Sequence, residues 1–195
     1  MATGAKELER SFWMALEEIL GLEQVQRISE HTFPLSGQPF CSLMQIMELQ
    51  KALEAVYGIH AGRGLALRSG RAWVKYGLRF FRDELGWNRS EFRLLPRPVR
   101  IQRGLEGLAS WMDRVFMEKF FVTRSLDGWL WQIHDCPLVI EPGGEFPCCY
   151  WMIGVLEETL QRLGDGKIYL VRALPSPPQK APVCLFEIPA RSLGD

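Results

Sequence analysis

The sequence has little that would mark a membrane-spanning, secreted or disulfide-bonded protein. No apolar run approaches the roughly 20 residues that a transmembrane helix needs. The start, MATGAKELERSFW, lacks the basic segment followed by an apolar one that marks a signal peptide. The 5 cysteines are odd in number and contain no C-x-x-C pair, so a disulfide framework is not indicated. These absences favour a cytoplasmic protein in a reducing compartment.

The motifs of the common enzyme classes are also absent. The chain has no phosphate-binding loop, no dinucleotide fingerprint, no nucleophile elbow and no H-E-x-x-H zinc motif. Glu157 and Glu158 could be read as an acid–base pair, but adjacent carboxylates on a helix point in different directions. The sequence therefore shows no self-evident enzyme and favours a protein without catalytic activity.

The formal net charge is zero, but the charged residues are unevenly distributed along the chain. Lys and Arg number 23, as do Asp and Glu, yet residues 57–103 carry 11 basic and 3 acidic side chains. Five of these basic residues recur at spacings of three and four, which places them on one helix face: Arg68, Arg71, Lys75, Arg79 and Arg82. Such a stripe could bind nucleic acid, an acidic protein or a ligand carboxylate. A solvated helix face is the simpler interpretation, because no nucleic-acid recognition motif accompanies it.

The first half of the chain has the hydrophobic period of helices. Segments with this period are Lys6–Gly21, Ser42–Tyr57, His60–Leu85 and Gln102–Met117. Prolines and a glycine predict a loop at His31–Phe40, and Pro96 and Pro98 predict an interruption within Ser90–Pro98. Ser42 is a candidate N-cap, and the glycines that follow two of these segments are typical helix stops.

The second half predicts strands around one helix. Two strands, Lys119–Ser125 and Trp129–His134, flank an Asp-Gly turn, which is typical of a hairpin. Cys149–Leu163 has a helical period, and Lys167–Ala173 and Val183–Ile188 are two further candidate strands. The order strand–strand–helix–strand–strand after the helices predicts an α+β fold with an antiparallel sheet. We expect a single domain over residues 1–195, with residues 1 to about 40 as a helical extension.

Aromatic residues gather where an α+β domain would hold a ligand. The alternation of WLWQIH places Trp129 and Trp131 on one sheet face. Small-molecule sites are mostly apolar with a few polar groups, which makes a subset of two or three of these rings candidates for a hydrophobic pocket. Ordinary core packing is the better explanation for most of them. The candidate ligand-binding residues are Trp111, Phe116, Phe121, Trp129, Trp131 and Tyr150.

The cysteines of the second half allow three interpretations. Cys136, Cys148, Cys149 and Cys184, with His134 nearby, include the ligand types of a zinc site. A thiol at a helix start, such as Cys149, could instead be reactive because the helix lowers its pKa. The third interpretation is that Cys149 and Cys184 are small buried apolar residues. Residue types and spacing favour the third interpretation, because no C-x-x-C pair is present and adjacent cysteines rarely bind the same ion.

Several short motifs resemble the 4-vinyl-reductase domain family. The motifs are Cys149-Tyr150 followed by Gly154 and Leu156, the strand Ile168–Val171, and C-x-F-E-I at Cys184–Ile188. Cys136-Pro137 and the block Tyr57–Ala72 resemble the same family. The resemblance implies a fold shared with the Bet-type subunits of TRAPP tethering complexes and related to haem–nitric-oxide-binding domains. It also implies a pocket for small hydrophobic molecules and frequent dimerisation.

Sensor members of that family hold zinc with three cysteines and a glutamate, and this chain matches the pattern only in part. Cys149 and Cys184 match the first and last cysteine, whereas the positions of the glutamate and the middle cysteine hold Ala173 and Ser176. The resemblance therefore implies a degenerate site unless Cys136, Cys148 or His134 substitutes. We expect no resident cofactor, with zinc as the one metal that these residues could hold.

The leading functional hypothesis is a non-catalytic module that binds a small hydrophobic molecule, such as a hydrocarbon, for a sensory or interaction role. The alternative, which the family name suggests, is an accessory protein, substrate carrier or reductase in tetrapyrrole or bacteriochlorophyll metabolism. A homodimer through the helical half is expected as well, since the helices Ser42–Tyr57 and Gln102–Met117 carry more apolar surface than one face can bury. The residues concerned include Leu43, Met44, Ile46, Met47 and Leu49.

Overall fold

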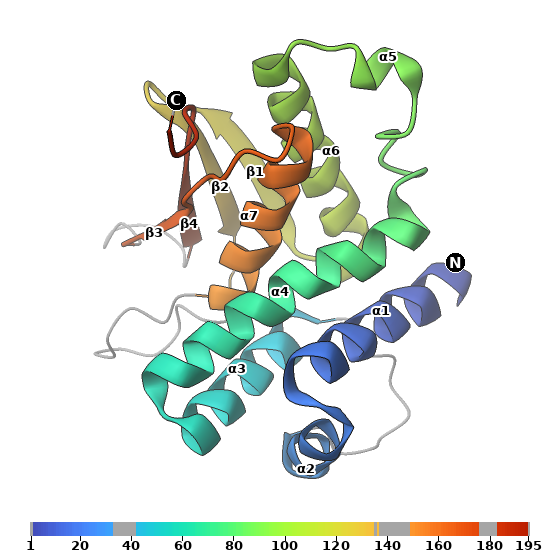
Figure 1. Ribbon diagram of the computed structural model, residues 1–195, viewed down its shortest axis with the longest axis vertical. Helices are drawn as coiled ribbons and strands as arrows, with labels where there is room; N and C mark the ends of the chain where they lie inside the picture. The colour runs from blue at the N-terminus through green and yellow to red at the C-terminus, as the bar shows by residue number, and fades with distance from the viewer. Residues whose placement is uncertain (1, 33–41, 135, 137–148, 176–182, 195) are drawn as a thin grey trace. The chain divides into compact units, whose positions relative to one another are not determined.

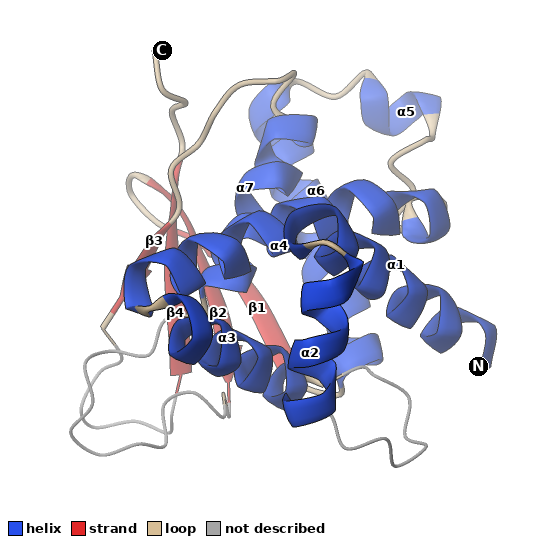
Figure 2. Ribbon diagram, turned by 60° about the horizontal axis from the view of Figure 1, so that its bottom comes forward, coloured by secondary structure: helices blue, strands red, loops and turns tan. Residues whose placement is uncertain are grey.

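The protein is described by a computed structural model that covers residues 2–32, 42–134, 136, 149–175 and 183–194. The chain divides into two compact units, residues 1–80 with 149–155 and residues 81–148 with 156–195. Within the described residues the first unit is entirely helical, and the second contains all of the strands, which are red in Figure 2. None of the described helices is long and apolar enough to cross a membrane.

Four helices and the first turns of a fifth make up the first unit (Figure 1). They are α1 (Ala2–Leu20), α2 (Leu22–Thr32), α3 (Leu43–Tyr57), α4 (Ile59–Phe81, as far as Phe80) and the beginning of α7 (Tyr150–Leu163). The predicted ends of α1 and α3 are confirmed, because Gly21 and Gly58 follow them with φ values of 80° and 82°. Only glycine adopts this backbone region without a steric penalty.

The N-terminus of α3 shows why that helix begins where the sequence predicts. The Ser42 hydroxyl accepts a hydrogen bond from the Gln45 backbone N–H at 3.2 Å, and the Gln45 side chain accepts one from the Ser42 N–H. This reciprocal capping box satisfies two backbone donors that the helix itself cannot pair. Ser42 is therefore confirmed as the N-cap.

Helix α2 was not expected from the sequence. It begins directly after Gly21 and buries Val25 and Ile28, one helical turn apart. His31 is its penultimate residue, so the predicted loop at His31–Phe40 starts too early; residues 33–40 lie outside the described part of the chain. The short apolar period of this helix, with Val25 and Ile28 as the buried residues within residues 22–29, is a weak signal among polar neighbours.

The apolar residues of α3 are mostly buried within the chain. Leu43, Ile46, Met47 and Leu49 are all buried, and only Met44 is about half exposed, at 48%. The homodimer was predicted from these residues. It stays a prediction, now without the exposed apolar helix face on which it was based.

Two glycines bring α4 and the start of α7 into backbone contact inside the first unit. A Cβ at Gly70 would collide with the Trp151 carbonyl oxygen, and a Cβ at Gly154 would collide with the Leu67 carbonyl oxygen. The close approach lets the Trp73 and Trp151 rings pack with centroids 5.0 Å apart. The two helices therefore fit together only while both positions lack a side chain.

The second unit contains a four-stranded antiparallel sheet in the order β1-β2-β4-β3 (Figure 1). Its elements are α5 (Ser90–Arg93), α6 (Arg97–Phe116), β1 (Lys119–Arg124), β2 (Gly128–His134), the remainder of α7, β3 (Arg172–Leu174) and β4 (Val183–Pro189). The predicted α+β class is confirmed, as is the hairpin, whose turn is closed by a hydrogen bond from Ser125 N–H to the Gly128 carbonyl at 3.0 Å.

Two predicted helix boundaries in this region are wrong. Helix α4 ends at Phe81 and not at Leu85, because the chain then enters a turn in which Gly86 has a φ of 69°. Helix α6 begins at Arg97, ahead of the predicted Gln102. Pro98 lies in its first turn, where a missing N–H costs nothing, so this proline starts the helix and does not interrupt it.

The predicted strand Lys167–Ala173 is also wrong over most of its length, since β3 covers only Arg172–Leu174. Backbone groups before β3 pair elsewhere. The Val171 N–H donates to Glu157 Oε1 at 3.3 Å, and the Ile168 carbonyl accepts from the Leu193 N–H at 2.8 Å. The hydrophobic alternation here reflects burial of Tyr169 and Val171 without a strand ladder.

The space around Gly154 and Gly64 predicts opposite effects when each is replaced by alanine. Gly154→Ala should lower the free energy of unfolding by about 3 kcal/mol, because the new methyl group meets backbone and cannot be accommodated by a side-chain rotation. Gly64→Ala, an open position on α4, should raise it by about 0.5–1 kcal/mol through helix propensity. Urea unfolding of both variants tests this; equal stability of the two would contradict the described packing.

Candidate ligand-binding site

The pairing register of β2 creates one buried apolar face on the sheet. Side chains directly opposite one another on antiparallel strands lie on the same face, and alternate residues of a strand share a face. Three β2 residues and their β4 partners follow this rule, and all six are buried: Trp129 with Ile188, Trp131 with Phe186, and Ile133 with Cys184. The sequence prediction that Trp129 and Trp131 share a face is confirmed. We refer to these six residues as the tryptophan face.

Aromatic rings from α6 and β1 extend the tryptophan face. The Phe120 ring lies 5.8 Å from the Trp131 ring and 6.2 Å from the Phe116 ring, measured between centroids. Asp113 of α6 accepts a hydrogen bond from the Phe120 backbone N–H, which fixes the start of β1 beside the end of the helix. Phe116 and Trp131, both predicted ligand-binding residues, are thus joined through Phe120.

Trp111 lies in a separate aromatic pair on α6. Its ring is 4.4 Å from that of Phe81, and its indole N–H donates to Glu84 Oε2 at 3.1 Å. Both the apolar ring and the polar N–H of this tryptophan therefore have protein partners. This arrangement is typical of a core residue, and Trp111 provides a reference for the tryptophans of the sheet.

Arg124 places a positive charge beside the tryptophan face. It is the register partner of Trp129 on β1, and its guanidinium lies 4.6 Å from the centre of the Trp129 ring. A guanidinium over an indole gains a cation–π attraction. Because the Arg124 side chain is exposed, its charge can also meet an anionic group.

Trp129 and Trp131 differ from Trp111 in one respect. Their exposed fractions are 1% and 0%, yet neither indole N–H has a hydrogen-bond partner among the described residues. A buried donor without an acceptor costs about 1–3 kcal/mol, and native proteins contain few of them. Two on the same strand face therefore call for an acceptor that the described residues do not provide.

The opposite face of the sheet carries two other predicted site residues. Phe121 is 45% exposed, and its ring packs edge-on against His134 at 4.8 Å. The His134 ring also lies 3.4 Å from the Gln132 side-chain oxygen. Strand alternation puts both Phe121 and His134 on the face away from Trp129 and Trp131, so the sheet separates residues that the sequence grouped together.

Tyr150, the sixth predicted ligand-binding residue, belongs to the first unit and begins α7. Its backbone N–H donates to Gln50 Oε1 of α3 at 2.9 Å, and Gln50 Nε2 donates in turn to Glu54 Oε1 at 2.9 Å. The Arg63 guanidinium lies 5.3 Å from the centre of the Tyr150 ring. Gln50, 100 residues away in sequence, thus caps the helix start that the sequence prediction singled out for its cysteine.

The candidate metal ligands are described only in part. Cys136, Cys149 and Cys184 are buried thiols, and Cys148 and Ser176 lie outside the described residues. Ala173, at the position of the family's glutamate, pairs with Phe186 on the tryptophan face and offers no ligand atom. Across the described ranges, no three His, Cys, Asp or Glu side chains are grouped so that they could hold a metal ion. Zinc therefore gains no support.

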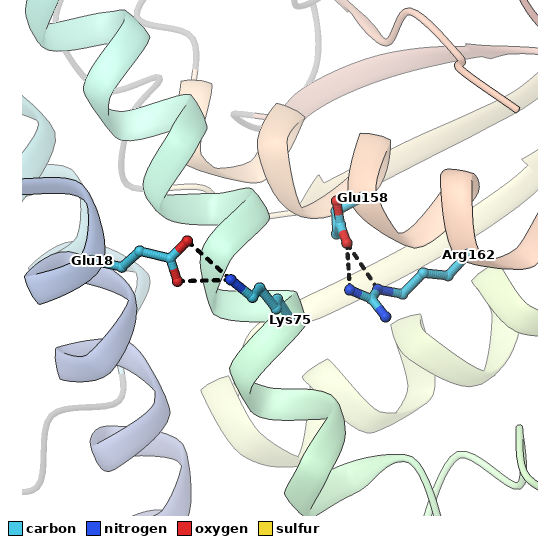
Figure 3. A network of polar contacts seen from close by, with 4 residues as sticks. All are labelled: Glu18, Lys75, Glu158 and Arg162. Atoms are coloured by element: carbon cyan, nitrogen blue, oxygen red, sulfur yellow. Dashed lines mark hydrogen bonds and ion pairs between the residues drawn. The ribbon is translucent and has the colours of Figure 1, made fainter. Parts of the chain in front are cut away.

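The basic stripe of α4 is exposed and partly engaged in contacts within the first unit. Lys75 Nζ lies 3.0 Å from both carboxylate oxygens of Glu18 (Figure 3). A hydrogen bond from Tyr76, followed by that from Lys75, lowers the pKa of Glu18, and the same carboxylate raises the pKa of Lys75. Arg79 lies over the Tyr76 ring at 5.5 Å. These partners suit a solvated helix face, the simpler of the two sequence interpretations.

Polar side chains fix both ends of α7's second-unit segment, in roles that the sequence did not indicate. Glu157, near its start, accepts from Val171 N–H, as described above. At its end, Arg100 of α6 donates to the Leu163 carbonyl at 2.8 Å and pairs with Asp165 at 2.5 Å, where a cation favours the helix dipole. Glu158 and Arg162 form an i,i+4 ion pair along the helix (Figure 3). No sequence motif marks the long-range contacts of Glu157 and Arg100.

No protein-family model matches the sequence, and no curated protein matches it. Solved structures do match the fold. One is from work on modulating haem redox potential through protein-induced porphyrin distortion, with a TM-score of 0.56, 10% identity, and coverage of 92% of this chain and 96% of that one. Another is from work on haem distortion in the H-NOX family, with a TM-score of 0.55, 9% identity, and coverage of 97% and 94%.

These comparisons bear on two expectations from the sequence, the family resemblance and the absence of a cofactor. They show that the chain has a fold like that of a structure from work on the H-NOX family, whereas the resemblance to the 4-vinyl-reductase domain remains unconfirmed. They also correct one expectation. A resident cofactor was considered unlikely, yet both structures with this fold come from studies of haem, so the absence of a cofactor is not a sound inference from the cysteine pattern.

The Gln50 cap predicts a measurable contribution to stability. Gln50→Ala leaves the Tyr150 N–H without its acceptor, and we expect the free energy of unfolding to fall by about 1–2 kcal/mol. Gln102→Ala is the matched control, because Gln102 also donates to a glutamate four residues on, Glu106, but caps no helix; its loss should cost no more than about 0.5 kcal/mol. Chemical denaturation measures both, and equal losses would argue against the cap.

Proposed function

We propose that this chain is a small-molecule-binding module with a sensory or interaction role, and that it takes a planar, apolar ligand at the tryptophan face. The observation that carries the proposal is a buried aromatic sheet face whose two indole donors have no described protein acceptor, in a fold shared with haem proteins. Pockets for small molecules combine apolar walls with a few polar groups, and this face has that composition.

The tryptophan face has few side chains that could hold haem iron. Haem iron in proteins is held by histidine, cysteine, methionine or tyrosine. His134 lies on the opposite face, and His60 is an exposed residue of α4 in the first unit. Among the residues of the tryptophan face itself the only such side chain is the Cys184 thiol. A haem held by an imidazole does not fit the described residues of this face.

A ligand recognised by its ring and substituents fits better than one recognised by its metal. Trp131, Phe186 and Phe120 provide apolar contact, and Arg124 provides a positive charge of the kind that binds a carboxylate. Metal-free tetrapyrroles belong to this chemical class, as do other planar aromatic acids. The resemblance to the 4-vinyl-reductase domain supports the same class of ligand.

A second candidate function is a carrier or accessory protein in tetrapyrrole metabolism, bacteriochlorophyll synthesis included. Its specific support is that the structures sharing this fold come from studies of haem, a tetrapyrrole. A carrier releases its ligand to an enzyme, whereas a sensor changes its own interactions on binding. Both require the same binding step, and that step is the one to test first.

Titration with metal-free protoporphyrin IX and with haem tests the proposal. Quenching of tryptophan fluorescence should follow the binding of both compounds. The metal-free ring should bind at least as tightly as haem, because contacts to the ring and its substituents, and not a bond to iron, hold the proposed ligand. His134→Ala should leave both dissociation constants unchanged within about twofold, since this side chain lies on the other face.

Trp131→Phe should weaken the binding of both compounds in the same experiment, since it shortens the apolar wall and removes a donor. Circular dichroism of each variant confirms that it is folded. Failure of the wild-type chain to bind either compound would contradict the proposed function for tetrapyrroles. Binding of haem alone, abolished by His134→Ala, would show that iron ligation holds the ligand and would contradict the placement at the tryptophan face.

A further inference from the structure

Two of the buried polar groups of the second unit that have no described partner lie on one strand, whereas others, such as the Trp87 indole N–H and the Thr159 hydroxyl, lie elsewhere. Trp129 and Trp131 bury both of their indole N–H groups without a described acceptor, while Trp111 of the same unit donates to Glu84. The tryptophan side chain is a hydrogen-bond donor only. A buried indole N–H therefore needs an oxygen or nitrogen acceptor, and apolar groups cannot satisfy it. The unmet need on this strand is therefore specific: acceptor atoms.

The spacing of the two donors limits what can satisfy them. Residues i and i+2 of a strand share a face and lie about 6.7 Å apart along it, so one ligand of two or three fused rings can reach both. The Trp129 end of this row carries the Arg124 guanidinium at 4.6 Å from the ring, and Trp131 lies deeper, beside Phe120. A charge and two neutral donors thus lie in sequence along one apolar face.

We propose that the ligand of this site is a planar aromatic molecule bearing carbonyl or similar acceptor atoms on its ring system and an acidic group at one end. The ring acceptors receive the indole N–H groups of Trp129 and Trp131, and the acidic group pairs with Arg124. This inference rests on the proposed function and adds to it the chemical class of the ligand. A purely hydrocarbon ligand leaves both donors unsatisfied and binds more weakly.

Two matched probes separate these cases. Anthraquinone-2-carboxylate and anthracene-2-carboxylate have the same fused rings and the same acidic group, and only the first carries ring carbonyls. Each neutral hydrogen bond gained is worth about a factor of five in affinity. We expect the wild-type chain to bind the quinone at least about tenfold more tightly, as measured by isothermal titration calorimetry.

Single-residue variants test which side chains cause the difference in affinity between the two probes. Trp131→Phe keeps an aromatic ring and removes the donor, so it should reduce the ratio of the two dissociation constants by about fivefold. Trp87→Phe is the control, because it removes another indole N–H that has no described partner but lies in the turn before α5, away from the sheet; the ratio should not change. Arg124→Gln should weaken the binding of both probes by a similar factor and leave the ratio of their dissociation constants unchanged.

Indole N–H resonances give a readout independent of variant stability. In a ¹⁵N-labelled wild-type sample, the Trp129 and Trp131 indole protons should shift downfield with the quinone, as expected for a new hydrogen bond, and should not do so with the anthracene. Equal affinities of the two probes, or a Trp131→Phe ratio identical to that of the wild type, would overturn the inference while leaving small-molecule binding intact. Binding of neither probe and of neither porphyrin would overturn the proposed function, and this inference with it.

Discussion

The register of β2 is the constraint on which the candidate site depends. This strand lies between β1 and β4, and its side chains alternate between a buried face with Trp129 and Trp131 and an opposite face with His134. A slip of one residue would exchange the two faces. The β2–β4 register also places Cys184 on the tryptophan face, and the β3–β4 register places Ala173 beside Phe186. These registers decide which side chains a ligand there could meet. The chemistry available at the face follows from hydrogen bonds between main chains.

Elsewhere the protein pairs its polar groups over long sequence separations. Gln50 caps the start of α7 from α3, Arg100 holds its end from α6, and Glu157 takes the backbone N–H of Val171. Unsatisfied buried groups are costly, and these contacts show how the fold avoids that cost. The two indole donors of β2 are not the only buried polar groups without a described partner, since the Trp87 indole N–H and the Thr159 hydroxyl are others, but these two lie two residues apart on one strand face. A ligand with acceptor atoms is the proposed partner of both.

Local patterns in the sequence predict much of the fold. The Ser42 cap, the Gly21 and Gly58 stops, the Asp-Gly hairpin and the burial of Trp129 with Trp131 all depend on residues close together in the chain. Errors arise where distant partners decide. Glu157 withdraws a backbone donor from the predicted strand Lys167–Ala173, and Pro98 lies at a helix start where it resembles a helix breaker.

The candidate site is predictable to a lesser degree for the same reason. Strand alternation alone indicates that Trp129 and Trp131 share a face. The sequence cannot show that Trp111 has Glu84 as an acceptor, whereas these two have no acceptor within the described part of the chain. The cysteines illustrate the limit of motif reasoning. Their spacing suggested a remnant metal site, and from it the absence of a cofactor, whereas the fold itself is shared with proteins from studies of haem.

A high-resolution crystal structure of the protein in complex with metal-free protoporphyrin IX tests ligand binding at the tryptophan face most directly. If the tryptophan face is the site, the ring system lies against Trp131 and Phe186, and acceptor atoms lie about 3 Å from the two indole nitrogens. Ordered water molecules at both nitrogens, with the porphyrin bound elsewhere or not at all, would contradict the assignment.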